Sequence, residues 1–189
     1  KASGDYRLSI KGVQNERLVF TLKGFNGEFR LRIPGRHNAR NAAGAIALAV
    51  SLLKNEKKPI TFTEVGKIRE SLENFTGSRR RSEIIGEAGG VLVIDDYGHH
   101  PTAVATTLSG LKEFYPGRRL VVDFMSHTYS RTAALLKEFS GAFKAADEVI
   151  LHKIYASARE QYDGTVSGET LYDAVRQKHR NVHYFKEVM

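Results

Sequence analysis

The stretch VLVIDDYGHHPT, residues 91–102, decides the fold. Its first four residues are apolar and rich in strand formers, which predicts a buried strand. Pro101 suits the first turn of a helix, where its missing N–H is not needed. In an open α/β sheet, ligands bind where strands end and the chain turns toward a helix. The polar residues 95–100 therefore predict a site for a nucleotide, a metal or a charged substrate.

Strand and helix patterns alternate along the chain after this stretch. Expected helices cover 101–114, 131–144 and 168–178, and expected strands cover 120–124, 149–151 and 182–184. Such alternation predicts parallel βαβ units. The predicted fold class is α/β, with a Rossmann-like, mostly parallel sheet. The strands that end at Ile94, Phe124 and Leu151 should run in the same direction in this sheet, so that one sheet edge would carry the polar segments 95–100, 126–131 and 155–160.

The residues before 77 have a different pattern, in which hairpins come before helices. Strand formers dominate 6–10, 17–22 and 28–33. Asn26-Gly27 is a strong hairpin-turn signal between the last two of these strands. A helix is expected over about 38–53, and the capping-box pattern at 61–64 predicts a second. The polar, basic stretch 74–82 is the expected interdomain linker.

Composition limits the classes of partner. The 189 residues carry a net charge of +8 and no cysteine, which excludes disulfides and thiolate metal sites. The longest apolar stretch, 42–53, is shorter than the ~20 residues that span a bilayer. We therefore expect a cytoplasmic protein with no membrane partner. The charge fits nucleic acid or phosphate-bearing substrates. Because the basic run 79–81 has no interleaved aromatic residues, nucleic acid is not expected.

Asn38 and Asn41 are candidates for recognising a base. They are three residues apart at a helix start and should share a face. A carboxamide both donates and accepts, which matches the edge of adenine. In the simpler alternative, Asn38 only caps the helix. The arginines of 79–81 either bind phosphate oxygens or lie in a solvated turn.

The main candidate cluster contains Asp95, Asp96, His99 and His100. A carboxylate can bind ribose hydroxyls or a hard cation. Histidine can bind a metal or act as a base. In the simpler alternative, His100 caps or packs against the helix that Pro101 begins.

A second candidate group follows the next strand. His127 and Arg131 could clamp a carboxylate with their positive side chains. Alternatively, Ser130 or Thr132 caps the following helix and Arg131 is merely solvated. The chemistry of segment 155–160, YASARE, assigns it no role by itself.

Five motifs together resemble the Mur ligases of bacterial peptidoglycan synthesis. In chain order they are PGRHNxxN at 34–41, FxG at 75–77 with Arg80 and Arg81, DDYGHHPT at 95–102, SHTYSRT at 126–132, and YASARE at 155–160. The resemblance is strongest to the branch that joins L-alanine to UDP-N-acetylmuramate. A recycling branch, which attaches a tripeptide to the same sugar nucleotide, shares a similar DD-x-x-HHPT element.

The resemblance implies that the chain is part of a three-domain, ATP- and Mg²⁺-dependent amide ligase. Residues 1–76 would be the end of the central ATPase domain, a hairpin and helix remnant. Residues 77–189 would be most of the C-terminal ligase domain, ending early. The chain contains no G-x-x-x-x-G-K-[ST] phosphate loop. We therefore expect the chain alone to be inactive.

Roles carried over from the resemblance divide the candidates into three groups. The catalytic group is Asp96, His99 and Arg81. The nucleotide-binding group is His37, Asn38, Asn41, Arg80, Arg81, Asp96 and Tyr97. The amino-acid group is His127, Arg131 and His100, and no metal ligand is expected in this chain. The chain departs from the family pattern at Ser82, where Phe is usual, and at Thr128, where Arg is frequent.

Two other classes stay open at the level of sequence. A metal-dependent phosphoesterase would use the DD…HH cluster, with Asp123 and His127 as further ligands. A non-enzymatic basic binding module would show steeply salt-dependent binding to generic DNA.

Overall fold

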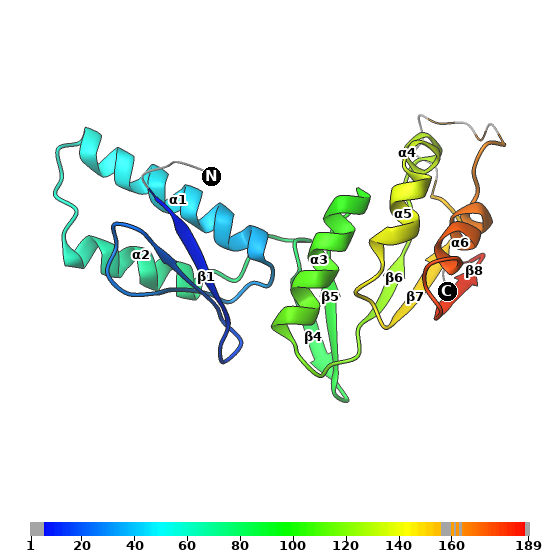
Figure 1. The fold of residues 1–189 in the computed structure, drawn as a ribbon, viewed down its shortest axis with the longest axis horizontal. Helices are drawn as coiled ribbons and strands as arrows, with labels where there is room; N and C mark the ends of the chain where they lie inside the picture. Colours follow the sequence, from blue (N-terminus) through cyan, green and yellow to red (C-terminus); the bar gives the residue numbers. More distant parts are fainter. Residues whose placement is uncertain (1–5, 156–159, 161, 163, 188–189) are drawn as a thin grey trace. The chain divides into compact units, whose positions relative to one another are not determined.

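The computed structural model describes residues 6–155, 160, 162 and 164–187, which belong to two compact units. The first unit contains the chain up to Asp96 together with Glu113–Tyr115, and the second contains Tyr97–Lys112 and the chain from Pro116 onward. In each unit helices pack against a sheet, as the ribbon in Figure 1 shows.

An antiparallel sheet of three strands begins the first unit. Strand β2 (Leu18–Leu22) lies between β1 (Leu8–Val13) and β3 (Phe29–Leu31). Alternate side chains of a strand share a face, and Phe20 of β2 stacks on Phe29 with ring centroids 5.4 Å apart. The predicted hairpin block is confirmed, and its apolar face forms the core of this unit.

Helices α1 (Arg36–Asn55) and α2 (Phe62–Asn74) complete this core. The buried side chains of α1 recur at helical spacing and are Ala39, Ala42, Ile46 and Val50. The two alanines allow a close approach to the sheet. Helix α1 starts two residues before the predicted position because Gly35, with φ of 97°, is its N-cap.

Strands β4 (Glu83–Ala88) and β5 (Val91–Asp95) form an antiparallel hairpin. Gly89 and Gly90 make the reversal, with φ of 56° and 80°, which favours glycine. The strand predicted over 91–94 is confirmed as β5, but the expectation that it is buried is wrong, because Val91 is 64% and Val93 is 52% exposed. The expectation that β5 joins the parallel sheet is wrong, because within the described residues β5 pairs only with β4. A two-residue turn is enough to pair β5 with β4, whereas a place in the parallel sheet would need a long crossover connection.

The second unit contains the predicted parallel sheet. Its strands are β6 (Val121–Phe124), β7 (Glu148–His152) and β8 (Val182–Phe185), in that order. Both pairings are parallel. The α/β class with a parallel sheet is therefore confirmed. The helices are α3 (Pro101–Phe114), α4 (Tyr129–Ala134), α5 (Leu136–Ala142) and α6 (Gly168–Arg176).

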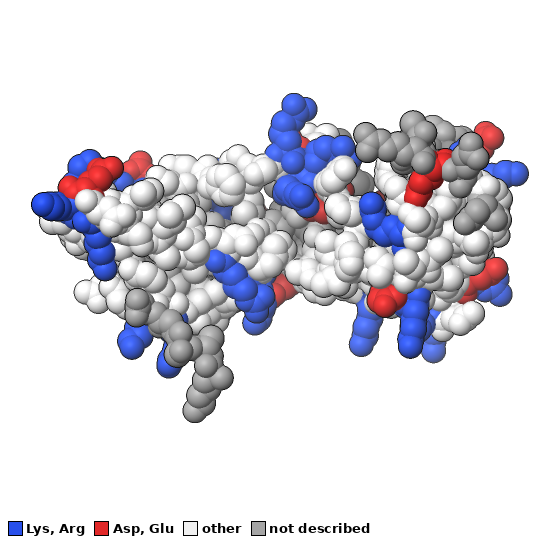
Figure 2. Space-filling view, turned by 90° about the horizontal axis from the view of Figure 1, so that it is seen from above, with Lys and Arg blue, Asp and Glu red and all other residues white. Residues whose placement is uncertain are grey.

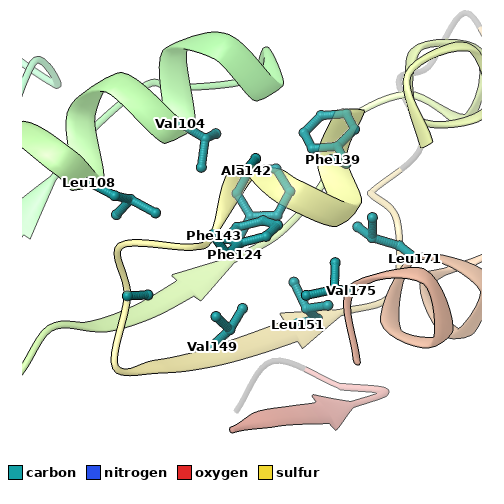
Figure 3. Packing of buried hydrophobic residues seen from close by; sticks show 11 residues of the cluster. Val104, Leu108, Phe124, Phe139, Ala142, Phe143, Val149, Leu151, Leu171 and Val175 are labelled. Atoms are coloured by element: carbon teal, nitrogen blue, oxygen red, sulfur yellow. The ribbon is translucent and has the colours of Figure 1, made fainter. Parts of the chain in front are cut away.

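The core of the second unit combines aliphatic side chains with a group of phenylalanines (Figure 3). The Phe124 ring lies 5.7 Å from that of Phe139 and 5.2 Å from that of Phe143. The single helix predicted over 131–144 is wrong, because Leu135, with φ of −116° and ψ of 21°, separates α4 from α5. Backbone hydrogen bonds continue on both sides of Leu135. The helical spacing of the apolar residues therefore continues across the break, which is why the sequence predicts a single helix.

Candidate functional site

The start of α1 places three predicted residues on its first two turns. Gly35 is required there because a Cβ would lie 2.5 Å from Cε1 of His37. Asn38 Nδ2 donates to the carbonyl of Pro34 at 2.7 Å, and Asn41 Nδ2 donates to Asn38 Oδ1 at 3.3 Å. The shared face of the two asparagines is confirmed. The capping alternative is wrong, because Gly35 is the N-cap and Asn38 closes the preceding turn.

Asp96 lies just after β5 and is held by Ser82. The backbone N–H and the Oγ of Ser82 donate to Asp96 Oδ2 at 2.8 and 3.2 Å. Ser82 is 8% exposed and has φ of 49°. A hydrogen bond from a hydroxyl and an N–H fixes the orientation of a carboxylate. Ser82 therefore orients Asp96 from a position 14 residues earlier.

Asp96 is close enough to His37 to act on the pKa of its imidazole. Burial lowers the pKa of His37, the Asp96 carboxylate opposes that shift, and Arg40 adds to it. The imidazole is therefore neutral at pH 7. Its Nδ1 is buried and has no hydrogen-bond partner among the described residues. The first unit thus brings His37, Asn38 and Asp96 into one neighbourhood.

The arginine run lies in the turn before β4. Arg80 pairs its Nε with Asp95 Oδ2 at 3.3 Å, and its backbone N–H donates to Glu83 Oε2 at 2.7 Å. The backbone N–H of Arg81 donates to the carbonyl of Ser78 at 3.1 Å, and the Arg81 side chain is exposed. The turn therefore holds this basic segment next to the end of β5.

The two histidines of DDYGHHPT have local partners in the second unit. His99 Nδ1 lies 3.1 Å from the carbonyl of Tyr97, and the two rings meet edge to face at 5.3 Å. His100 Nδ1 accepts from the backbone N–H of Thr102 at 3.2 Å, and its carbonyl accepts from Val104. His100 thus caps α3, as the simpler alternative predicted. Both imidazoles are exposed.

The loops after β6 and β7 lie side by side in the second unit. His127 and Tyr155 form a parallel bridge, and their rings are 5.4 Å apart. The predicted shared edge is therefore confirmed for these two polar segments. Arg131 is half-buried and its Nη1 donates to the carbonyl of His127 at 3.4 Å. His127 and Arg131 are neighbours, as the carboxylate-clamp hypothesis requires.

Glu160 provides the cap that the sequence assigned to a hydroxyl. Its Oε2 accepts from Tyr129 N at 2.8 Å, and its Oε1 accepts from Ser130 N at 3.3 Å and from the Ser130 hydroxyl. Neither Ser130 nor Thr132 caps α4, since Thr128 is its N-cap and makes no side-chain bond. The Ser130 hydroxyl, the two backbone N–H groups and the charge of Arg131 lower the pKa of Glu160.

Sequence reasoning missed the roles of Ser82 and Glu160. Ser82 was noted only as a departure from the usual Phe, and Glu160 only as part of YASARE. Each acts on a residue 14 to 31 positions away, so no local spacing signals the contact. For Ser82, the sequence signal was a short side chain with a hydroxyl directly after the arginine pair.

The charged residues of both units are distributed over the visible face rather than gathered on one element (Figure 2). Several cations have acidic partners, as in the pairs of Lys112 with Asp147 and Arg119 with Glu148. Within the described residues, no three His, Asp or Glu side chains come together as metal ligands do. No helix there has both the length and the apolar character that a bilayer crossing requires.

Comparisons with known proteins agree with the motifs. The relative named UDP-N-acetylmuramate–L-alanine ligase in Treponema pallidum strain Nichols is 56% identical over all 189 residues, which cover 39% of the relative. A ligase of the same name in Desulfitobacterium hafniense is 43% identical over 158 residues, covering 84% of this chain and 33% of the relative. The chain thus spans about two fifths or less of the length of these relatives.

Solved structures and a family model extend the comparison. The crystal structure of UDP-N-acetylmuramate-alanine ligase from Thermotoga maritima superposes with a TM-score of 0.75 at 25% identity, covering 98% of this chain and 38% of that one. A murein peptide ligase from Psychrobacter arcticus shares the fold, with a TM-score of 0.53 at 23% identity. The model described as "Mur ligase, glutamate ligase domain" matches residues 80–189. This match covers more than half of the sequence, and the chain belongs to the Mur ligase family.

Proposed function

We propose that this chain is part of an ATP-dependent amide ligase that joins L-alanine to the carboxylate of UDP-N-acetylmuramate. The observation that carries the proposal is the 56% identity over all 189 residues to a ligase of that name. We assign residues 1–76 to the end of the central ATPase domain and 77–189 to the C-terminal ligase domain. We propose the bacterial cytoplasm as the place of this reaction.

The first unit supplies all the proposed nucleotide-binding residues except Tyr97, which belongs to the second unit. Asp96 would accept hydrogen bonds from ribose hydroxyls, with Oδ2 oriented by Ser82. Neutral His37 and the carboxamides of Asn38 and Asn41 fit an uncharged base that both donates and accepts. The remaining proposed members of this group are Arg80, Arg81 and Tyr97. Arginine suits phosphate oxygens because its N–H groups form a planar fork.

Ser82→Ala tests the orientation of Asp96. The substitution removes the hydroxyl bond at 3.2 Å and leaves the backbone bond at 2.8 Å. Because one hydrogen bond contributes about 0.5–1.5 kcal/mol, the KM for ATP should rise about 2- to 10-fold. Steady-state kinetics of the full-length enzyme measure this, with Ser71→Ala on α2 as the matched control. An unchanged KM for ATP would remove Ser82 from this role.

The second unit supplies the proposed amino-acid site. Arg131 and His127 would bind the carboxylate of L-alanine, and His100 would lie beside them. Arg131→Ala should raise the KM for L-alanine roughly 10- to 100-fold, as expected for loss of a charged partner, and change the KM for ATP much less. Lys137→Ala removes a charge of the same sign from an exposed position of α5 and serves as a control. Equal losses for both substrates would contradict a dedicated clamp.

The proposed reaction has two steps. The muramyl carboxylate attacks the γ-phosphorus of ATP and expels ADP, which gives an acyl phosphate. The amine of L-alanine then attacks that carbonyl carbon and expels phosphate. Charge neutralisation and positioning dominate such chemistry, and we assign Arg81, Asp96 and His99 to it. Mg²⁺ would neutralise phosphate charge, but the described residues offer no cluster for it, so we assign it no residue here.

Trapping the acyl phosphate tests this function. Full-length enzyme with ATP, Mg²⁺ and UDP-N-acetylmuramate, but with hydroxylamine in place of L-alanine, should yield the hydroxamate of the sugar nucleotide and release phosphate. Mass spectrometry identifies the product. The 189-residue chain, which contains no phosphate loop, should give none. Phosphate release from ATP without any hydroxamate would contradict an acyl-phosphate ligase.

A further inference from the structure

Segment 155–160 has no role in the proposed reaction, yet its last residue accepts three hydrogen bonds from the first turn of α4, which carries Arg131. Glu160 accepts from the N–H groups of Tyr129 and Ser130 and from the Ser130 hydroxyl. Glu160 is therefore engaged by its own chain through both carboxylate oxygens.

Other contacts join the same two loops at their opposite ends. The backbone N–H of Tyr155 donates to Ser126 at 2.8 Å, and that of Thr128 donates to the carbonyl of Tyr155 at 3.3 Å. Thr128 has φ of 81°, a conformation that costs free energy for a β-branched residue. The loop that carries His127 and Arg131 is thus held at its beginning by Tyr155 and at the first turn of α4 by Glu160.

We propose that Glu160 is a positioning residue for the amino-acid substrate: it fixes the turn from Thr128 to Arg131 so that Arg131 and His127 meet the substrate carboxylate together. This inference rests on the proposed function. It assigns to the loop after β7 a task that its own chemistry does not reveal. Charge-assisted bonds from two N–H groups and a hydroxyl are strong enough to hold such a turn.

The same turn also brings the guanidinium of Arg131 near the carboxylate of Glu160. Arg131 is near enough to Glu160 for their charges to interact, and its Nη1 also bonds to the carbonyl of His127. Loss of the Glu160 charge would release the turn and leave Arg131 free to adopt other rotamers. The amino acid would then lose a preorganised partner, whereas the nucleotide residues of the first unit would be untouched.

Glu160→Gln in the full-length enzyme tests the inference. An amide accepts through only one oxygen, so the KM for L-alanine should rise about tenfold, as expected for loss of one charge-assisted bond. The KM for ATP should change less than about twofold because the change is confined to this turn. Amide exchange at Tyr129 and Ser130 should accelerate, while exchange in β6 and β7 stays the same.

Two further variants make the test decisive. Ser130→Ala removes only the hydroxyl donor and should raise the KM for L-alanine by about two- to fivefold, which carries the test if Glu160→Gln does not fold. Glu138→Gln removes the same charge from the exposed first turn of α5 and should have no effect. An unchanged KM for L-alanine, or equal rises for L-alanine and ATP, would overturn the positioning role.

The wild-type enzyme separates this inference from the proposed function. If it shows no turnover that depends on L-alanine, the proposed function has failed, and the positioning role fails with it. If the wild type uses L-alanine and the Glu160 and Ser130 variants match it, only the positioning role has failed.

Discussion

Asp96→Ala should reduce kcat/KM for ATP about 10- to 100-fold in the full-length enzyme, since hydrogen bonds to a charged group contribute about 1.5–3 kcal/mol. Ser82 fixes Asp96 Oδ2 with two hydrogen bonds, so the carboxylate is preorganised for its ligand. The substitution removes the proposed contact with the nucleotide and also the oxygen that accepts the two hydrogen bonds from Ser82.

Steady-state kinetics with ATP as the varied substrate measure this effect. Asp173→Ala is the matched control, because Asp173 is a mostly exposed carboxylate on α6 that pairs with Arg176. The control should retain wild-type kinetics. Unchanged kcat and KM in Asp96→Ala would exclude Asp96 from the nucleotide site.

Phe139→Ala should destabilise the chain by about 3–5 kcal/mol, the usual cost of replacing a buried Phe. Phe139 is 0% exposed and packs against Phe124 in the core of the second unit (Figure 3). The truncation leaves a cavity between α5 and the sheet. Such a loss is comparable to the whole stability of many domains.

Urea unfolding of the 189-residue chain, followed by circular dichroism, measures the change. Phe62→Ala is the matched control, because Phe62 on α2 is 84% exposed; its effect should be within about 0.5 kcal/mol. A Phe139→Ala variant as stable as the Phe62→Ala variant would contradict the packing described for this core.

Local patterns predicted most of the secondary structure. The parallel strands, the hairpin block and α3 follow from periodicity and turn residues. The same patterns could not predict that β5, in the described part of the chain, pairs with β4 and not with the parallel sheet, because the choice between two possible strand partners depends on tertiary contacts. The dihedral change at Leu135 was hidden for a related reason: the apolar period continues across it.

The candidate site shows the same division. The shared face of Asn38 and Asn41 followed from their spacing, and it is observed. The neighbourhood of His127 and Tyr155 followed from parallel strands, and it too is observed. The hydrogen bonds between Glu160 and Ser130 could be found only in the structure, because the two residues lie 30 positions apart in the sequence.

The domain boundary remains a proposal. We place it at residues 76 and 77, and the family match begins close by, at residue 80. The compact units divide later, after Asp96, so that the β4–β5 hairpin groups with the first unit. Among the residues that the structure describes, β4 and β5 pair only with each other, so neither sheet ties this hairpin to its own unit.

Phosphate release by the full-length enzyme tests the central claim most directly. The enzyme receives ATP, Mg²⁺ and UDP-N-acetylmuramate, with either L-alanine or the tripeptide L-Ala-γ-D-Glu-meso-diaminopimelate. We predict release that depends on L-alanine. Release with the tripeptide alone would assign the chain to the recycling branch of the family, and no release with either amine would contradict the proposed ligase activity.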